Sequence, residues 1–81
     1  MWREAYPGDR VCVTPMTRMQ AANDNHQALA RREPGGGPYG PNTCRQGFVW
    51  REARAGDLVC VAPPTRAETA MDNRLAAARR L

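Results

Sequence analysis

The most constraining feature of this sequence is an internal duplication. Residues 2–33 align with residues 50–81 without a gap, at a constant offset of 48, and 19 of the 32 aligned positions are identical. Self-similarity at a fixed spacing is typical of proteins built from recurring supersecondary units. We therefore expect a site that belongs to the repeat to be present in both copies.

The composition predicts a thin hydrophobic core. Leu, Ile, Val and Phe together number only ten among the 81 residues. A chain this small with so few large apolar side chains needs an additional covalent or intermolecular constraint. No stretch of 18 apolar residues is present, so we expect no membrane span.

The charged residues are twelve arginines, no lysine and eight acids, with a formal net charge of +4. Because these arginines alternate with Asp and Glu and form no continuous stripe, we rank nucleic-acid binding third among the functions considered. The sequence contains no Ser, and its single histidine, His26, does not recur. We therefore expect no catalytic triad, no enzyme activity and no cofactor.

Each copy is predicted to form a β-hairpin followed by a helix. In the second copy, Phe48–Ala53 has the character of a strand and Leu58–Val61 that of its return strand. In the first copy, Pro7 and Gly8 suit the central positions of a type II turn.

The helices are predicted to begin at capping boxes, Thr17 with Gln20 and Thr65 with Glu68. An apolar face of the second helix is then expected against the hairpin. Its members are Ala67, Ala70, Met71, Leu75 and Ala78.

The predicted fold class is α+β, with two tandem ββα modules joined by a Gly/Pro-rich linker. We place the first module at 1–32, the linker at 33–43 and the second module at 44–81. The chain begins inside a repeat, which suggests a piece of a longer array.

The three cysteines favour one disulfide. Cys44 and Cys60 have fifteen residues between them, and a bridge would constrain the second hairpin by roughly 3 kcal/mol. The alternative is that all cysteines are reduced in a cytosolic protein. The counterpart of Cys44 in the first copy would lie four residues before Met1, so Cys12 is either free, paired with another chain, or paired with Cys44.

Metal sites are not expected. The cysteine spacing does not match that of structural zinc sites. Soft ligands for copper are present in Cys12, Met16, Met19 and His26, but only Cys12 recurs in the second copy.

Recurring charged residues predict contacts between helix and hairpin. Arg66, and its counterpart Arg18, stand at a helix start, where the helix dipole disfavours a cation. We expect an acidic partner in the hairpin, Asp57 or Glu52 in the second copy. Asp9 is the equivalent of Asp57 in the first copy.

The helices also share the pairs Asp24-Asn25 and Asp72-Asn73. We favour a structural role, in which Asn73, and by repetition Asn25, bonds a backbone group of the hairpin. The alternative is a ligand or ion contact repeated along an array.

Trp2 and Trp50 are predicted to form the core of each module. In the alternative they are exposed platforms for sugar rings or nucleobases, with Arg3 or Arg51 stacked nearby.

The shared segments are Trp-Arg-Glu-Ala, Gly-Asp, Val-Cys-Val, Thr-Arg and Asp-Asn, with Gly40-Pro41-Asn42-Thr43-Cys44 before the second copy. This pattern resembles short cysteine-bearing tandem repeats of uncharacterised bacterial proteins that are often predicted to be exported. The resemblance implies export and a module that recurs in longer proteins, and it carries no activity that transfers.

The function predicted from the sequence is therefore a non-enzymatic, extracellular structural repeat that associates with itself. The alternative is a multivalent module that binds a polymer or carbohydrate through Trp2 and Trp50. We expect a secreted or cell-surface protein, or a cytoplasmic one if the cysteines are reduced. The first hairpin is expected to pack against the second module or a neighbouring chain.

Overall fold

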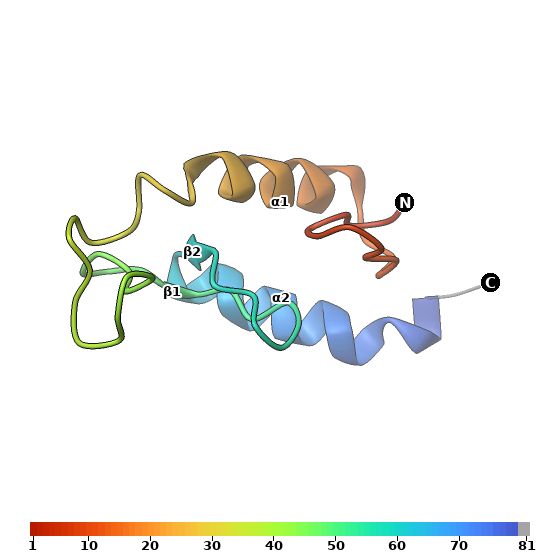
Figure 1. The fold of residues 1–81 in the computed structure, drawn as a ribbon. Helices are drawn as coiled ribbons and strands as arrows, with labels where there is room; N and C mark the ends of the chain where they lie inside the picture. The colour runs from red at the N-terminus through yellow and green to blue at the C-terminus, as the bar shows by residue number, and fades with distance from the viewer. Residues whose placement is uncertain (80–81) are drawn as a thin grey trace.

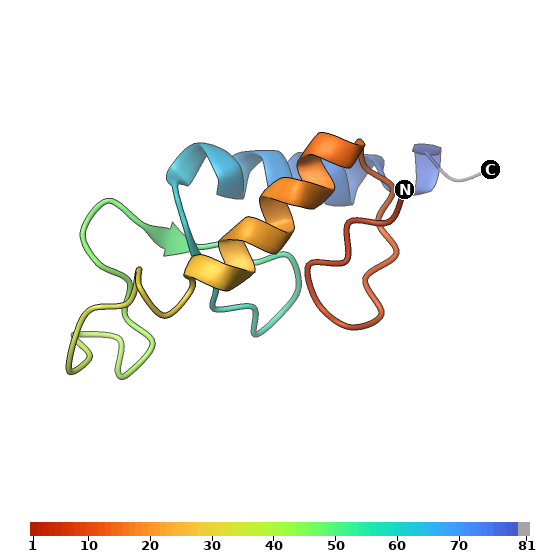
Figure 2. The ribbon, with the colours of Figure 1, turned by 90° about the horizontal axis from the view of Figure 1, so that it is seen from above.

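The computed structural model describes residues 1–79, so the last two residues of the predicted second module lie outside it. Figure 1 shows the two main helices running in roughly opposite directions, and Figure 2 shows that they cross obliquely. The elements in chain order are α1 (Pro15–Gln27), β1 (Val49–Trp50), β2 (Cys60–Val61), α2 (Pro63–Leu75) and the 3₁₀ helix η1 (Ala77–Arg79). This is the small α+β fold that the sequence predicted.

The strands are shorter than predicted. β1 and β2 pair antiparallel, with Val49 opposite Val61 and Trp50 opposite Cys60. The first copy has a single isolated bridge, between Trp2 and Cys12.

Side-chain hydrogen bonding explains why the second hairpin leaves the β conformation so early. The carboxylate of Asp57 accepts hydrogen bonds from the backbone N–H groups of Ala53 (2.9 Å) and Val59 (3.4 Å). Beyond the bond from the N–H of Arg51 to the carbonyl of Val59, a carboxylate and not a partner strand therefore closes the loop. Glu52 within this loop has a φ of 55°, in the left-handed region.

The turn predicted at Pro7-Gly8 is confirmed. The N–H of Asp9 donates to the carbonyl of Tyr6 at 3.0 Å, and Gly8 has a φ of 86°. A type II turn requires a positive φ at its third position, which glycine adopts without a steric cost.

The helices begin earlier than predicted, and the two capping boxes are not formed. The N-cap of α1 is Thr14, whose hydroxyl accepts from the N–H of Thr17 at 3.2 Å. The N-cap of α2 is Ala62, which has no side chain able to cap. Pro15 starts α1 because proline at the first helical position needs no hydrogen-bond acceptor. Thr65 therefore lies inside α2 instead of capping it.

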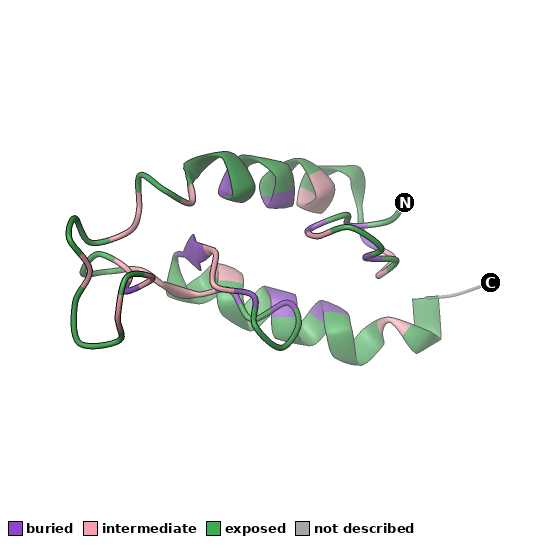
Figure 3. Cartoon of the chain, viewed as in Figure 1, coloured by how far each residue is buried: buried purple, intermediate pink, exposed green. Residues whose placement is uncertain are grey.

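The predicted apolar face of the second helix does not pack against the hairpin. All five of its members are exposed, and the buried residues of α2 are Thr69 and Asp72 (Figure 3). In α1 the buried residues are Ala21 and Asp24. The helices therefore turn small and acidic side chains inward, and the hydrophobic core is correspondingly small. Its members are Ala5, Val13, Ala21, Ala53, Cys60 and Val61.

The segment predicted as a linker, 33–43, is hydrogen-bonded along its length. The N–H of Glu33 donates to the carbonyl of Thr43 at 2.8 Å, which brings the ends of the segment together. Between them Gly37 and Gly40 form an antiparallel bridge, and the hydroxyl of Thr43 accepts from the N–H of Tyr39 at 3.0 Å. None of the described helices has the length and apolar character needed to cross a bilayer.

Candidate interaction surfaces

A buried ion pair occurs at the same place in each copy. The guanidinium of Arg3 donates to the carboxylate of Asp9 through Nε (2.7 Å) and Nη2 (3.2 Å). Arg51 and Asp57 repeat this geometry at 2.8 and 3.2 Å. All four side chains are at most 6% exposed. Two parallel N–H···O bonds orient both partners and make such pairs among the stronger polar contacts.

The electrostatics of the two carboxylates follow from these contacts. Burial by itself raises the pKa of Asp9, but the hydrogen bond from Arg3 and the backbone N–H groups of Ala5 and Val11 outweigh it, so the pKa lies below its ordinary value. At Asp57, too, burial by itself raises the pKa. The hydrogen bond from Arg51, the backbone N–H groups and the positive charge of Arg51 outweigh it, so the pKa lies below its ordinary value. Both carboxylates are therefore ionised at neutral pH.

The helix asparagines make the contacts predicted for them. The amide of Asn25 donates to the carbonyl of Ala5 at 3.0 Å, and Asn73 donates to Ala53 at 3.0 Å. The predicted hydrogen bond to a backbone group is therefore present in both copies, and it attaches each helix to the loop of its own copy.

The end of each helix region carries an arginine whose ion pair the sequence analysis did not predict. Arg31 pairs with Asp24 at 2.9 Å, and Arg79 pairs with Asp72 at 2.8 Å. The recurrence of an Arg seven positions after an Asp in both copies was the available signal. These pairs account for the acids that face inward from α1 and α2.

The same two arginines also form hydrogen bonds to the other copy. Nη1 of Arg31 also donates to the carbonyl of Cys60 at 3.2 Å, and Nη1 of Arg79 donates to the carbonyl of Cys12 at 3.3 Å. Each copy thus gives and receives the same contact, as the subunits of a two-fold symmetric dimer do.

A second contact joins equivalent positions directly. Tyr6 and Arg54 occupy the same place in the two copies, and the guanidinium of Arg54 lies 4.3 Å from the centre of the Tyr6 ring. Residues that meet their own counterparts lie close to a symmetry axis.

The arrangement departs from symmetry around the buried arginines. Nη1 of Arg51 donates to Oδ1 of Asn25 in the first copy at 3.0 Å. The equivalent Nη1 of Arg3 is buried and has no hydrogen-bond partner within residues 1–79, and the same holds for Oδ2 of Asp24. Both side chains line a cavity of about 20 Å³ between the helices.

The arginines at the helix starts have acidic partners on the surface. Arg66 lies 3.6 Å from Glu52, one of its two predicted partners, and Arg18 lies 3.1 Å from Glu4. Asp57 is not the partner of Arg66, because its carboxylate is fully engaged by Arg51 and the backbone.

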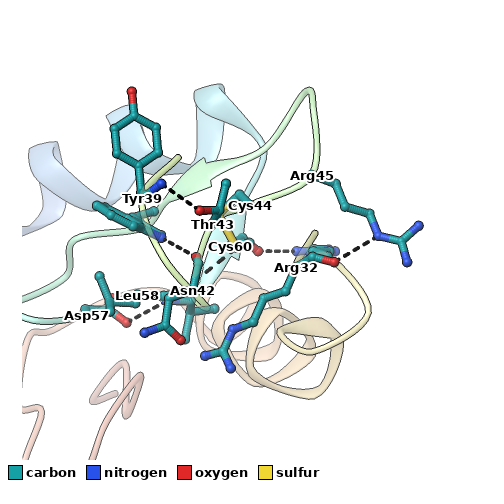
Figure 4. Close-up of a disulfide and its surroundings, with 12 residues drawn as sticks. Arg32, Tyr39, Asn42, Thr43, Cys44, Arg45, Asp57, Leu58 and Cys60 are labelled. Carbon is teal, nitrogen blue, oxygen red and sulfur yellow. Dashed lines mark hydrogen bonds between the residues drawn. A yellow bond between two sulfur atoms is a disulfide. The ribbon is translucent and has the colours of Figure 1, made fainter. Parts of the chain in front are cut away.

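The predicted disulfide between Cys44 and Cys60 is confirmed, and Cys12 is free. Figure 4 shows the segment that carries Cys44 as it runs past Cys60. Two residues before Cys44, the carbonyl of Asn42 accepts from the indole N–H of Trp50 at 2.9 Å.

Neither tryptophan forms the core, so that prediction is wrong. Trp50 is partly buried, with the ring of Tyr39 packed edge-on at 5.9 Å between ring centres. Trp2 is 49% exposed, and Arg10 stacks over it at 4.9 Å. The alternative placement of Arg3 or Arg51 beside them is also wrong, because both guanidinium groups are buried in the ion pairs with Asp.

Other sequence candidates are not brought together. Within residues 1–79 no group of three or more His, Cys, Asp or Glu side chains is arranged to hold a metal ion. Met16 and Met19 are exposed on α1. No family model, curated protein or solved structure matches this chain.

Proposed function

We propose that this protein is a non-enzymatic, secreted structural repeat that associates with further copies of itself. The proposal takes the chain as two tandem ββα units that pack as a pair. The Cys44–Cys60 disulfide supports export, because disulfides persist mainly in oxidising compartments. The resemblance to tandem repeats of exported bacterial proteins agrees with this assignment.

The observation that carries the proposal is the exposed apolar face of α2. Met71 and Leu75 lie one helical turn apart and are 50% and 39% exposed. Ala67 lies a further turn toward the start of the helix and is exposed as well. Contiguous apolar side chains on a small protein mark a surface for another protein. In a chain with so little buried apolar area, covering this face offers a substantial gain in stability.

Sedimentation velocity over a range of concentrations tests the proposal. We expect a mass above 9.0 kDa that rises with concentration. The double variant Met71→Gln/Leu75→Gln is expected to dissociate, with an association constant lower by roughly 100-fold. The variant removes two half-exposed side chains from each of two copies, and burying each is worth about 1 kcal/mol. The net loss is smaller than the total because part of this area stays exposed to water in the complex.

The matched control is Arg74→Gln, on an exposed position of the same helix. It removes a charge and leaves Met71 and Leu75 in place, and we expect association to be unchanged. A chain that stays monomeric at every concentration contradicts the proposal, and so does equal loss of association in the control.

A second candidate is ligand binding, favoured by a groove of about 370 Å³ beside the disulfide. Its lining includes the aromatic residues Tyr39, Phe48 and Trp50 and the charged residues Glu52 and Arg66. Such aromatic walls with a few polar groups suit sugar rings. Titration with soluble oligosaccharides, followed by tryptophan fluorescence, tests it, and no change in emission at millimolar ligand contradicts it. Nucleic-acid binding gains no support, because six of the eleven arginines within residues 1–79 are engaged in ion pairs with acids.

A further inference from the structure

We propose that Cys12, with Trp2 paired opposite it and Arg79 bonded to its carbonyl, marks a docking site for an extended, cysteine-bearing segment of the type found at 39–45. The segment comes from another copy of the repeat, and Cys12 forms a disulfide with its cysteine. The source of the segment rests on the proposed function, whereas the surface itself rests on the duplication.

The second copy contains the same surface with such a segment in place. Cys44 is bonded to Cys60, and the carbonyl of Asn42 accepts from the indole of Trp50 at 2.9 Å. Backbone pairing extends the contact, because the N–H of Arg45 donates to the carbonyl of Arg31 at 2.8 Å. The segment is therefore held by a covalent bond, by an indole and by the end of the opposite helix region.

The first copy presents the same framework. The carbonyl of Cys12 accepts from Arg79 at 3.3 Å, as that of Cys60 accepts from Arg31 at 3.2 Å. The backbone N–H of Arg3 donates to Val11 at 2.8 Å, which matches the bond from Arg51 to Val59. The site around Cys12 is thus preorganised, which reduces the entropy lost when a segment binds.

The two copies differ in how far this surface is exposed to solvent. Cys60 is fully buried, whereas Cys12 is partly exposed. The side chain of Arg31 is 19% exposed and that of Arg79 is 38% exposed. A cavity of about 460 Å³ borders both Cys12 and Arg79. The indole N–H of Trp50 donates to the carbonyl of Asn42, whereas that of Trp2 has no acceptor within residues 1–79.

The occupied counterpart distinguishes this site from a solitary thiol. Cys60 stands at the position equivalent to Cys12 and carries a cysteine ligand in the same chain. A small thiol would form the disulfide alone, whereas a segment like 39–45 also engages the indole and the end of the helix region. The chemistry therefore favours a peptide of this sequence over an unspecific thiol.

The bond-forming step is a thiol–disulfide exchange. The Cys12 thiolate attacks the cysteine sulfur of a peptide that is held as a mixed disulfide with glutathione. The new S–S bond joins Cys12 to the peptide, and the old bond breaks. Glutathione leaves as the thiolate with the electron pair, so no further oxidant is needed.

The experiment uses the whole chain with Cys44–Cys60 intact and a synthetic peptide with the sequence of residues 37–46. The peptide is supplied as its glutathione mixed disulfide, and intact mass gives the equilibrium ratio of adduct to free protein. A control peptide has the same composition in scrambled order. We expect the native order to be preferred by about tenfold, the effect of one or two additional hydrogen bonds. In the adduct, the indole N–H of Trp2 is expected to become protected from hydrogen exchange.

Two variants identify the residues that form the adduct and that select the peptide. Cys12→Ser is expected to form no adduct, and an adduct with it would show attack on Cys44–Cys60 and overturn the proposal. Trp2→Ala, at an exposed position, is expected to form the adduct but to lose the preference for the native peptide. Equal ratios for both peptides, or a Cys12–Cys12 dimer that excludes the peptide, also overturn it. Neither outcome depends on the face of α2, so failure here leaves the self-association proposal standing.

Discussion

Replacing Asp57 by alanine is expected to cost about 4 kcal/mol of unfolding free energy. The substitution removes both hydrogen bonds to Arg51 and leaves a buried guanidinium without its counter-charge. It also removes the acceptor of the Ala53 and Val59 N–H groups. Removing one partner of a buried ion pair typically costs about 3–5 kcal/mol, because the remaining charge stays desolvated. Stability of small domains is about 5–15 kcal/mol, so this one change removes a large part of it.

Urea denaturation followed by circular dichroism measures the loss, with two controls. Glu52→Gln removes the exposed contact to Arg66 and is expected to cost less than about 1 kcal/mol. Asp9→Ala makes the equivalent change in the first copy. It is expected to cost at least as much as Asp57→Ala, because Arg51 keeps hydrogen bonds to Asn25 and Ala5 while Arg3 has none to replace Asp9. If Asp57→Ala costs no more than Glu52→Gln, the buried pair does not hold the fold.

Acid titration examines the same pairs by another route. The pKa values of Asp9 and Asp57 are lower in the folded protein than their ordinary value of 3.8. The stability they contribute is therefore complete above that pH and is lost as the pH falls through the folded-state pKa values. We expect Asp57→Asn to reduce this acid dependence, and an unchanged dependence contradicts the assignment.

Three further changes separate the other contributions. Replacing Cys44 and Cys60 by alanine is expected to cost about 3 kcal/mol in thermal or urea unfolding, and a loss near zero contradicts a constraining role for the bridge. Ala62→Thr gives α2 the side-chain cap that α1 has and is expected to raise stability by about 1 kcal/mol, whereas a loss refutes the observed helix start. Asn25→Ala is expected to cost more than Asn73→Ala in urea unfolding, because Asn25 also accepts from Arg51, and the reverse order contradicts the asymmetry between the copies.

The features that sequence analysis predicted correctly are those set by local spacing. The disulfide follows from the positions of Cys44 and Cys60 around one hairpin, and the turn follows from the conformational limits of Pro7 and Gly8. The contact of Asn73 with a hairpin backbone group was predicted because a polar residue recurred in mid-helix. Each of these depends on residues close together in the chain or on one repeated position.

The interior could not be predicted from the usual separation of apolar and charged residues. That rule places Met71 and Leu75 inside and Arg51 outside, and the structure has the reverse. The buried side chains of Arg3 and Arg51 line the space between the helices, where the helices present the small Ala21 and Thr69. The inward acids Asp24 and Asp72 pair with Arg31 and Arg79. Only the joint recurrence of Arg and Asp six residues apart in both copies carried this information.

The contacts between copies also lie beyond sequence pattern. Arg31 and Cys60 are 29 positions apart, and Arg79 and Cys12 are 67 positions apart. Their pairing follows from the reciprocal packing of two copies, and a duplication alone is equally compatible with separate units.

Amide hydrogen exchange, with the disulfide intact and with both of its cysteines replaced by alanine, tests the reciprocal packing most directly. The informative probes are the N–H groups of Ala5 and Ala53, which donate to equivalent carboxylates in the two copies. If the copies form one cooperative unit, both amides open only with the whole fold. Loss of the disulfide in the second copy should then lower the protection of Ala5 and Ala53 by the same free energy, about 3 kcal/mol. Reduced protection at Ala53 with unchanged protection at Ala5 would contradict the account.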